Sequence, residues 1–72
     1  MNAYNFTARF SDNTEIVSAN LKDCIKAAKQ WAKEQYHYNE TFKILDKSNT
    51  CIQTIEFCPI KFSNGRYFKS IF

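Results

Sequence analysis

The chain has 72 residues, with ten lysines and arginines against seven aspartates and glutamates, which gives a formal net charge of +3. With one glycine and one proline it is neither low-complexity nor disordered, and it has no run of about 18 apolar residues that could span a membrane. Because the N-terminal segment also lacks the basic flank and apolar stretch of a signal peptide, we expect a single domain, residues 1–72, in the cytoplasm.

The N-terminal part of the chain predicts a β-hairpin. Apolar and polar side chains alternate over residues 4–10, the period of two that is typical of a strand with one buried face. Ser11, Asp12 and Asn13 follow as a cluster of turn-forming residues. Residues 14–19 then predict a second strand centred on Ile16 and Val17, so the two strands most simply form a hairpin.

A helix is predicted over residues 21–36. Asn20 is a good N-cap residue, and Asp23 places an acid in the first turn, where the helix dipole favours it. The apolar residues of this segment recur at helical spacing and predict the side that packs on the sheet. They are Leu21, Cys24, Ile25, Ala28, Trp31, Ala32 and Tyr36.

Four lysines occupy a different side of the same predicted helix. They are spaced four, three and four residues apart, so at about 100° per residue they fall within an arc of about 60°. They are Lys22, Lys26, Lys29 and Lys33. Asp23 and Glu34 are expected on the far side of this stripe, where they do not neutralise it. The stripe fits either a solvated helix surface or a contact surface for an acidic partner, and both interpretations stay open.

The C-terminal half predicts three more strands. Residues 41–46 and 50–57 form the first two, separated by a turn at 47–49. Cys58 and Pro59 predict a bend or bulge, because proline cannot donate to the sheet, and the strand is expected to resume over 60–63. Asn64 and Gly65 predict a type I′ turn, which leads into a last strand over 66–71.

The predicted fold class is therefore α+β, with element order ββαβββ. An antiparallel sheet of four or five strands carries one helix packed on one face. The opposite face is expected to stay open to a partner and to carry Asn5, Thr7, Arg9, Lys43 and either Lys61 or Lys69.

The sequence contains no arrangement typical of a catalytic or metal site, so we expect a protein that is not an enzyme and that has no cofactor. The single histidine, His37, stands at the helix end, and no nucleophile motif or carboxylate pair accompanies it. The three cysteines lack both a disulfide framework and zinc spacing. Cys24 and Cys51 are expected to be buried thiols, Cys51 in phase with Ile55.

The pair Tyr67 and Phe68, flanked by Arg66 and Lys69, is similar to the base-stacking surfaces of nucleic-acid-binding proteins. However, the strand lacks the glycine-aromatic pattern of an RNA-recognition motif. We therefore expect Phe68 to pack in the core.

Four short runs between residues 13 and 44 resemble a known family. They read Asn-Thr-Glu-Ile, Ser-Ala-Asn-Leu-Lys, Ala-Lys-Glu-Gln-Tyr and Thr-Phe-Lys-Ile. They resemble the small phage-encoded anti-CRISPR proteins that act on type I-F systems, in particular those built as an antiparallel sheet with one helix. The resemblance implies an inhibitor, in the host cell cytoplasm, that binds Cas protein subunits of the CRISPR surveillance complex. Such an inhibitor blocks the access of target DNA to the guide RNA.

The resemblance also implies partner-binding residues in the Lys-Glu-Gln run. Lys33 and Gln35 match residues that such inhibitors present to the complex, and Lys29 lies one turn earlier on the helix. With Lys22 and Lys26 from the stripe, these residues form the candidate partner-binding site. The alternative is a small basic phage protein that binds nucleic acid directly through the same lysines. A homodimer formed through a sheet edge also stays open.

Overall fold

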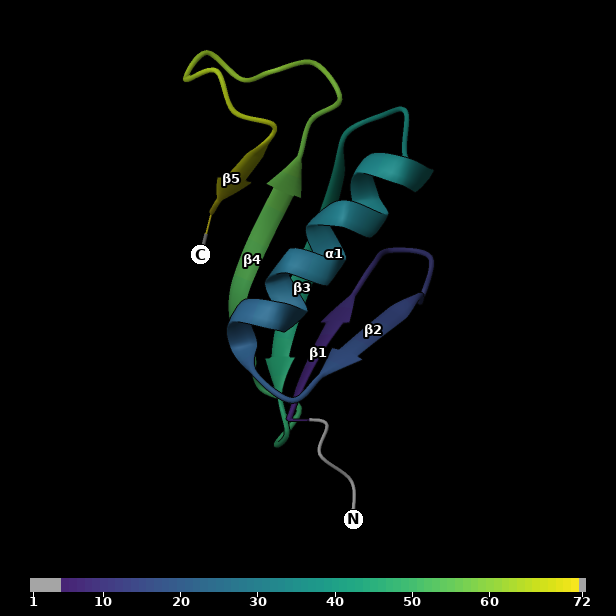
Figure 1. The fold of residues 1–72 in the computed structure, drawn as a ribbon, viewed down its shortest axis with the longest axis vertical. Coiled ribbons are helices and arrows are strands. Elements are labelled where there is room, and N and C mark those ends of the chain that lie inside the picture. Colours follow the sequence, from purple (N-terminus) through teal and green to yellow (C-terminus); the bar gives the residue numbers. More distant parts are fainter. Residues whose placement is uncertain (1–4, 72) are drawn as a thin grey trace.

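The computed structural model describes residues 5–71 of the chain. Its elements are β1 (Phe6–Arg9), β2 (Glu15–Ser18), α1 (Leu21–Gln35), β3 (Glu40–Asp46), β4 (Cys51–Phe57) and β5 (Phe68–Ser70). Within the described residues the strands form one antiparallel sheet in the order β2-β1-β3-β4-β5. Helix α1 runs across one face of this sheet, as Figure 1 shows. The predicted α+β fold with order ββαβββ is confirmed.

Helix α1 begins at the predicted cap. The Asp23 N–H donates to Asn20 Oδ1 at 2.8 Å, and Asn20 Nδ2 donates back to Asp23 Oδ2 at 2.9 Å. The helix ends at Gln35, one residue before the predicted boundary, because the backbone of Tyr36 is extended. The Tyr36 N–H still donates to the Ala32 carbonyl at 3.0 Å, which is the last hydrogen bond of the helical pattern. Local chemistry thus defines both ends of the helix.

The core lies between α1 and the covered face of the sheet. The helix contributes mainly small side chains, with Cys24, Ala28 and Ala32 fully buried, which lets its backbone approach the strands closely. Most of the large residues of the buried cluster come from strands β3 and β4, namely Phe42, Ile44, Ile55 and Phe57, and Phe10 directly after β1 adds a further ring. Leu21, Ile25 and Trp31 are partly buried against this cluster, and Tyr36 belongs to it. The predicted apolar side of the helix is therefore confirmed.

Three tight turns share one geometry. Asn13, Asn49 and Gly65 have positive φ angles of 70°, 66° and 80°. In each turn the N–H of this residue donates to a carbonyl three residues earlier, with N···O distances of 2.8–3.0 Å. This pattern is the three-residue hairpin loop that ends in a left-handed residue. The turns were predicted in the right places, but the type I′ turn at Asn64 and Gly65 was wrong, since Gly65 alone of the two has positive φ.

The strand predicted after Pro59 is absent from the described residues. The Cys58 N–H still donates to the Tyr67 carbonyl at 2.8 Å, but Pro59 has no N–H to continue the ladder. Residues 58–67 therefore leave the sheet as a loop that projects past the end of β4, as Figure 1 shows. The last strand is correspondingly shorter than predicted, Phe68–Ser70. Tyr4, which the sequence assigned to the first strand, lies outside the described residues.

The irregular pairing of the sheet lies between β3 and β4. Ile44 pairs with Gln53, whereas Leu45 pairs with Cys51, so Ile52 is an extra residue in β4. Because neighbouring residues of a strand face opposite ways, Cys51 follows Leu45 to the face away from the helix. Cys51 is half-buried, so the expected core position beside Ile55 was wrong. The core position of Cys24 is confirmed.

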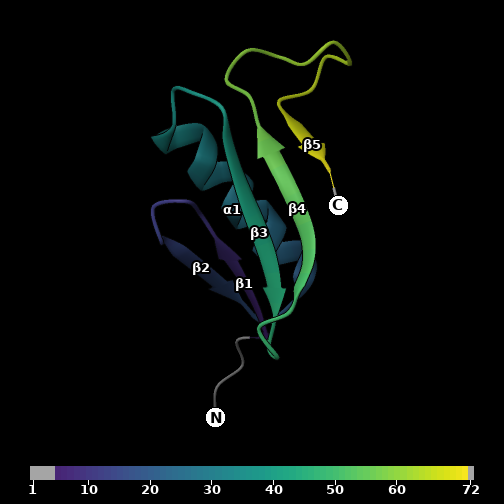
Figure 2. The same ribbon diagram turned by 180° about the vertical axis from the view of Figure 1, so that it is seen from behind.

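The second face of the sheet carries no helix, as Figure 2 shows. The strand register places Thr7, Arg9 and Lys43 on this face, together with Lys69 beside Glu56. Lys61 lies in the loop instead, and Asn5 precedes β1. Arg9 is paired with Glu15 across β1 and β2 at 2.7 Å, so this face has charges of both signs.

Candidate binding surface

Four lysines lie along one flank of α1, the flank that is next to Tyr67 and Phe68. Lys22, Lys26 and Lys33 are exposed, and Lys29 is half-buried at the edge of the packed side. At 1.5 Å per residue the row extends about 16 Å along the helix axis. We call this row the lysine face, defined by Lys22, Lys26, Lys29 and Lys33.

The charges of the lysine face are not neutralised by ion pairs. Among residues 5–71 the structure has one ion pair, Arg9–Glu15, on the opposite side of the sheet. Glu34 is nearer than the sequence suggested, because it lines a shallow hollow of about 350 Å³ beside the lysines. Its carboxylate accepts a hydrogen bond from Gln30 Nε2 at 3.4 Å and has no ion pair with a lysine. The lysine face therefore keeps a strong net positive charge.

Two of these lysines also contact aromatic rings of the C-terminal segment, which we define as residues 58–70. Lys29 Nζ lies 5.3 Å from the centroid of the Phe68 ring, and Lys33 Nζ lies 5.3 Å from that of Tyr67. Lys61 Nζ, from the loop itself, lies 5.7 Å from the same Tyr67 ring. Such cation–π contacts contribute about 0.5–1 kcal/mol each at exposed sites. They join the helix to the C-terminal segment in one surface.

Gln35, the fifth residue of the candidate site, is not on the lysine face. It is exposed at the last position of α1. Being two residues after Lys33, it points about 200° away around the helix axis. The structure thus brings the four lysines together and leaves Gln35 apart from them.

The two rings of the C-terminal segment are already in contact with protein groups. Phe68 packs on Phe57 with ring centroids 5.2 Å apart, and both Tyr67 and Phe68 are partly buried against the core. This confirms the expected packing role of Phe68. Bases that stacked on Tyr67 or Phe68 would have to displace these contacts.

A separate polar cluster joins the β1–β2 turn to the end of the helix. Ser11 Oγ donates to the buried carboxylate of Glu40 at 2.5 Å, and the Tyr36 hydroxyl donates to Asp12 Oδ2 at 3.3 Å. Burial raises the pKa of the Tyr36 phenol, and the nearby carboxylates of Glu40 and Asp12 raise it further. The phenol therefore stays protonated and acts as a donor. The cluster fixes the turn against the helix end.

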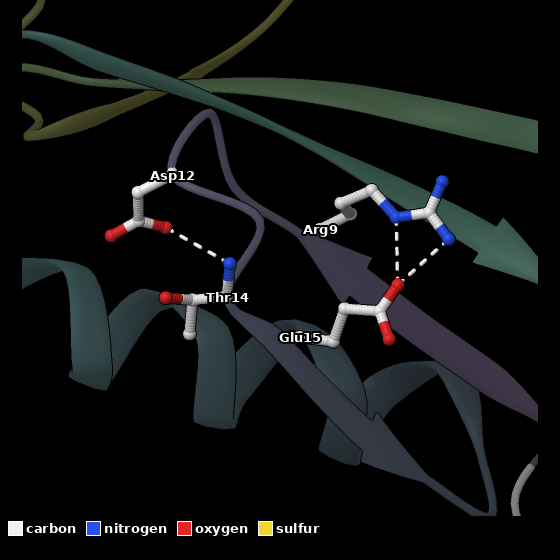
Figure 3. Close-up of polar contacts among 4 residues, drawn as sticks. All are labelled: Arg9, Asp12, Thr14 and Glu15. Atoms are coloured by element: carbon white, nitrogen blue, oxygen red, sulfur yellow. Dashed lines mark hydrogen bonds and ion pairs between the residues drawn. The ribbon is translucent and has the colours of Figure 1, made fainter.

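Figure 3 shows the polar contacts of the turn itself. The Thr14 N–H donates to Asp12 Oδ1 at 3.0 Å, and this bond lowers the pKa of the Asp12 carboxyl group. The sequence predicted Asp12 only as a turn residue, and it left Glu40 outside the third strand, which was expected to begin at residue 41 but begins at Glu40. The one signal for the cluster was the acidic residue Glu40 in phase with Phe42 and Ile44, the buried positions of an alternating strand.

Among the described residues we find no arrangement typical of a metal-binding or catalytic site. Within residues 5–71, no group of three or more histidine, cysteine or acidic side chains is placed to hold a metal ion. Burial raises the pKa of the Cys24 thiol, which keeps it protonated and poorly nucleophilic. His37 is exposed in the loop after α1. No helix in this part of the chain has the length and apolar character needed to cross a membrane.

Comparison of the chain with protein-family models, curated proteins and solved structures finds no match. The feature of the structure that bears on function is therefore the lysine face with its surroundings.

Proposed function

We propose that this protein is an anti-CRISPR inhibitor of the host cytoplasm, which binds a CRISPR surveillance complex through its lysine face and keeps target DNA from the guide RNA. The observation that supports the proposal is the row of four lysines without carboxylate partners on one rigid helix. The channel that holds the guide–target duplex in such a complex is positively charged, so its lining would repel the lysine face. The lysines instead fit an acidic surface of the Cas subunits or the phosphates of the guide RNA, and a small protein bound there blocks the approach of target DNA.

The support of the helix by the sheet strengthens this proposal. Cys24, Ala28 and Ala32 are fully buried against the strands, so the lysines are displayed from a fixed helix rather than from a mobile loop. A rigid support lowers the entropy that binding must overcome. Lys33, which the sequence resemblance matched, and Lys29, one turn earlier, lie between the helix and the C-terminal segment.

The second candidate function is direct nucleic-acid binding through the same lysines. Its supporting observation is the length of the row, because about 16 Å corresponds to roughly five steps of 3.4 Å along one nucleic-acid strand. The two functions differ in their response to salt. A protein that neutralises several phosphates loses affinity steeply as salt rises, whereas an inhibitor anchored on protein subunits retains much of its affinity.

The test of the proposed function is inhibition of target DNA binding by a purified type I-F surveillance complex. The wild-type protein should prevent the gel shift of a labelled target duplex, and the double variant Lys29→Glu, Lys33→Glu should not. The matched control is Lys43→Glu, Lys47→Glu, which makes the same charge change at two exposed lysines outside the helix. Thermal unfolding of all variants verifies that they are folded. Inhibition that survives the Lys29 and Lys33 changes, or that the control loses equally, would contradict the proposal.

A further inference from the structure

The lysine face continues beyond the helix onto the C-terminal segment. Three ammonium groups lie within 6 Å of just two rings, those of Tyr67 and Phe68. These three contacts meet at one place among the described residues, where ammonium groups of the helix and of the loop lie over ring faces.

An aromatic ring can prepare a lysine for binding. The face of the ring carries a partial negative charge that attracts the ammonium group. A free lysine side chain has many rotamers and loses that freedom when a partner immobilises it. A lysine already held over a ring has lost part of this freedom in the unbound protein, so it binds an anion at a smaller entropic cost.

We infer that Tyr67 and Phe68 are positioning residues for Lys33 and Lys29, respectively. Lys61 is a fifth cation of the same surface. This surface fits an acidic helix of a partner protein. The inference deepens the proposed function and rests on it, because it names the kind of surface within the target complex. Lys61 was not part of the site that the sequence predicted.

The geometry favours an acidic helix over a nucleic-acid strand. The lysines are separated by three and four residues, or about one helical turn of 5.4 Å each. Carboxylates at the same spacing on a partner helix would form a row of equal pitch. Proteins that bind single strands without sequence preference stack bases on aromatic faces. Here Lys33 and Lys61 lie over Tyr67, while Phe68 packs on Phe57 below Lys29.

The positioning role can be tested without any partner. Carbon–proton NMR spectra should show the ε-methylene resonances of Lys33 and Lys61 shifted upfield by the Tyr67 ring, relative to those of the exposed Lys47. Tyr67→Leu should remove the upfield shift of Lys33 and Lys61 and leave the Lys29 resonances unchanged. Tyr67→Phe keeps the ring and should therefore retain the shift. Resonances of Lys33 and Lys61 that coincide with those of Lys47 in the wild type would overturn the positioning role.

The partner class is tested with three labelled probes in fluorescence anisotropy. The first is an alanine-rich peptide of about 20 residues, long enough to be partly helical, with glutamates at positions i, i+4, i+7 and i+11. The second has the same composition with the glutamates distributed around the helix, and the third is a thymidine oligonucleotide of equal charge. The wild type should bind the first probe most tightly.

The variants identify the residues responsible. Lys61→Glu should weaken binding of the first peptide, and Tyr67→Leu should weaken it about two- to fivefold, with Tyr67→Phe close to the wild type. Lys47→Glu is the control for net charge and should have little effect. Equal binding of the two peptides, or tighter binding of the oligonucleotide, would overturn the assignment to an acidic helix. Because the surveillance complex is absent, these outcomes are independent of the inhibition assay.

Discussion

Replacement of Lys22 by glutamate is expected to stabilise the fold while it weakens binding. Lys22 is exposed and is the second residue of α1, where the partial positive charge of the helix N-terminus disfavours a cation. It also stands four residues before Lys26, so the two ammonium groups repel each other along one side of the helix. Both effects oppose folding at neutral pH.

The size of the effect follows from the position of the residue. The helix dipole contributes about 0.3–1 kcal/mol for a charge at an exposed helix end, and a like-charged pair four residues apart costs about 0.2–0.5 kcal/mol. Lys22→Glu reverses both signs, so the free energy of unfolding should rise by about 1–3 kcal/mol at low salt. Lys22→Gln removes the unfavourable interactions with the helix dipole and with Lys26 but adds no favourable ones. It should therefore give about half of this gain.

Urea denaturation followed by tryptophan fluorescence measures this change. Trp31 is the single tryptophan, and its ring lies 4.7 Å from that of Phe10, so unfolding changes its surroundings. The gain should be present at about 0.01 M salt and largely lost at about 1 M, where the screening length falls to about 3 Å. Lys47→Glu, in the turn after β3, is the control with the same charge change. A less stable Lys22→Glu protein at low salt, or a gain that salt does not reduce, would refute the reasoning.

Three further predictions concern the fold that supports the lysine face. Gly65→Ala should cost about 1 kcal/mol because φ is +80°, whereas Gly65→Asn should cost less, since Asn13 has the same role in its own turn; urea midpoints compare the two variants. The pKa of Asp12 is lower in the folded state than its ordinary value of 3.8. The ionised carboxylate therefore stabilises the fold above pH 3.8, and this stabilisation is lost as the pH falls through the lowered pKa. The stability difference between the wild type and Asp12→Asn should therefore shrink as the pH is lowered from neutral to well below 3.8, and a constant difference would contradict the stabilising role of the carboxylate. Phe42→Ala empties a fully buried position and should cost about 3–5 kcal/mol of unfolding free energy, with a loss below about 1 kcal/mol counting against the observed packing.

The parts of the fold that depend on local chemistry were predictable from the sequence. Asn20 caps the helix because its side chain reaches an N–H three residues away, and such a contact is visible in the sequence. The apolar spacing within the helix identified Cys24, Ala28 and Ala32 as its packed side. The turns at residues 11–13 and 47–49 were recognisable by composition alone.

The features that depend on contacts between distant segments were not predictable. The extra residue Ile52 in β4 results from the pairing of β3 with β4, and it moved Cys51 away from the core. The contact between Lys33 and Tyr67 joins residues that are far apart in the chain. No periodicity of either segment contains that information, so the sequence indicated the lysine row but not its extension onto the C-terminal segment.

Lysine footprinting on the proposed target complex tests the proposed function most directly. The protein, free and bound to a purified type I-F surveillance complex, is acetylated with a lysine-reactive ester and analysed by mass spectrometry. If the lysine face binds the complex, Lys22, Lys26, Lys29 and Lys33 should become protected. Lys43 and Lys47, which are exposed outside the helix, should be modified equally in both states. Protection of Lys43 and Lys47 with the helix lysines still reactive would show that another face of the protein binds the complex.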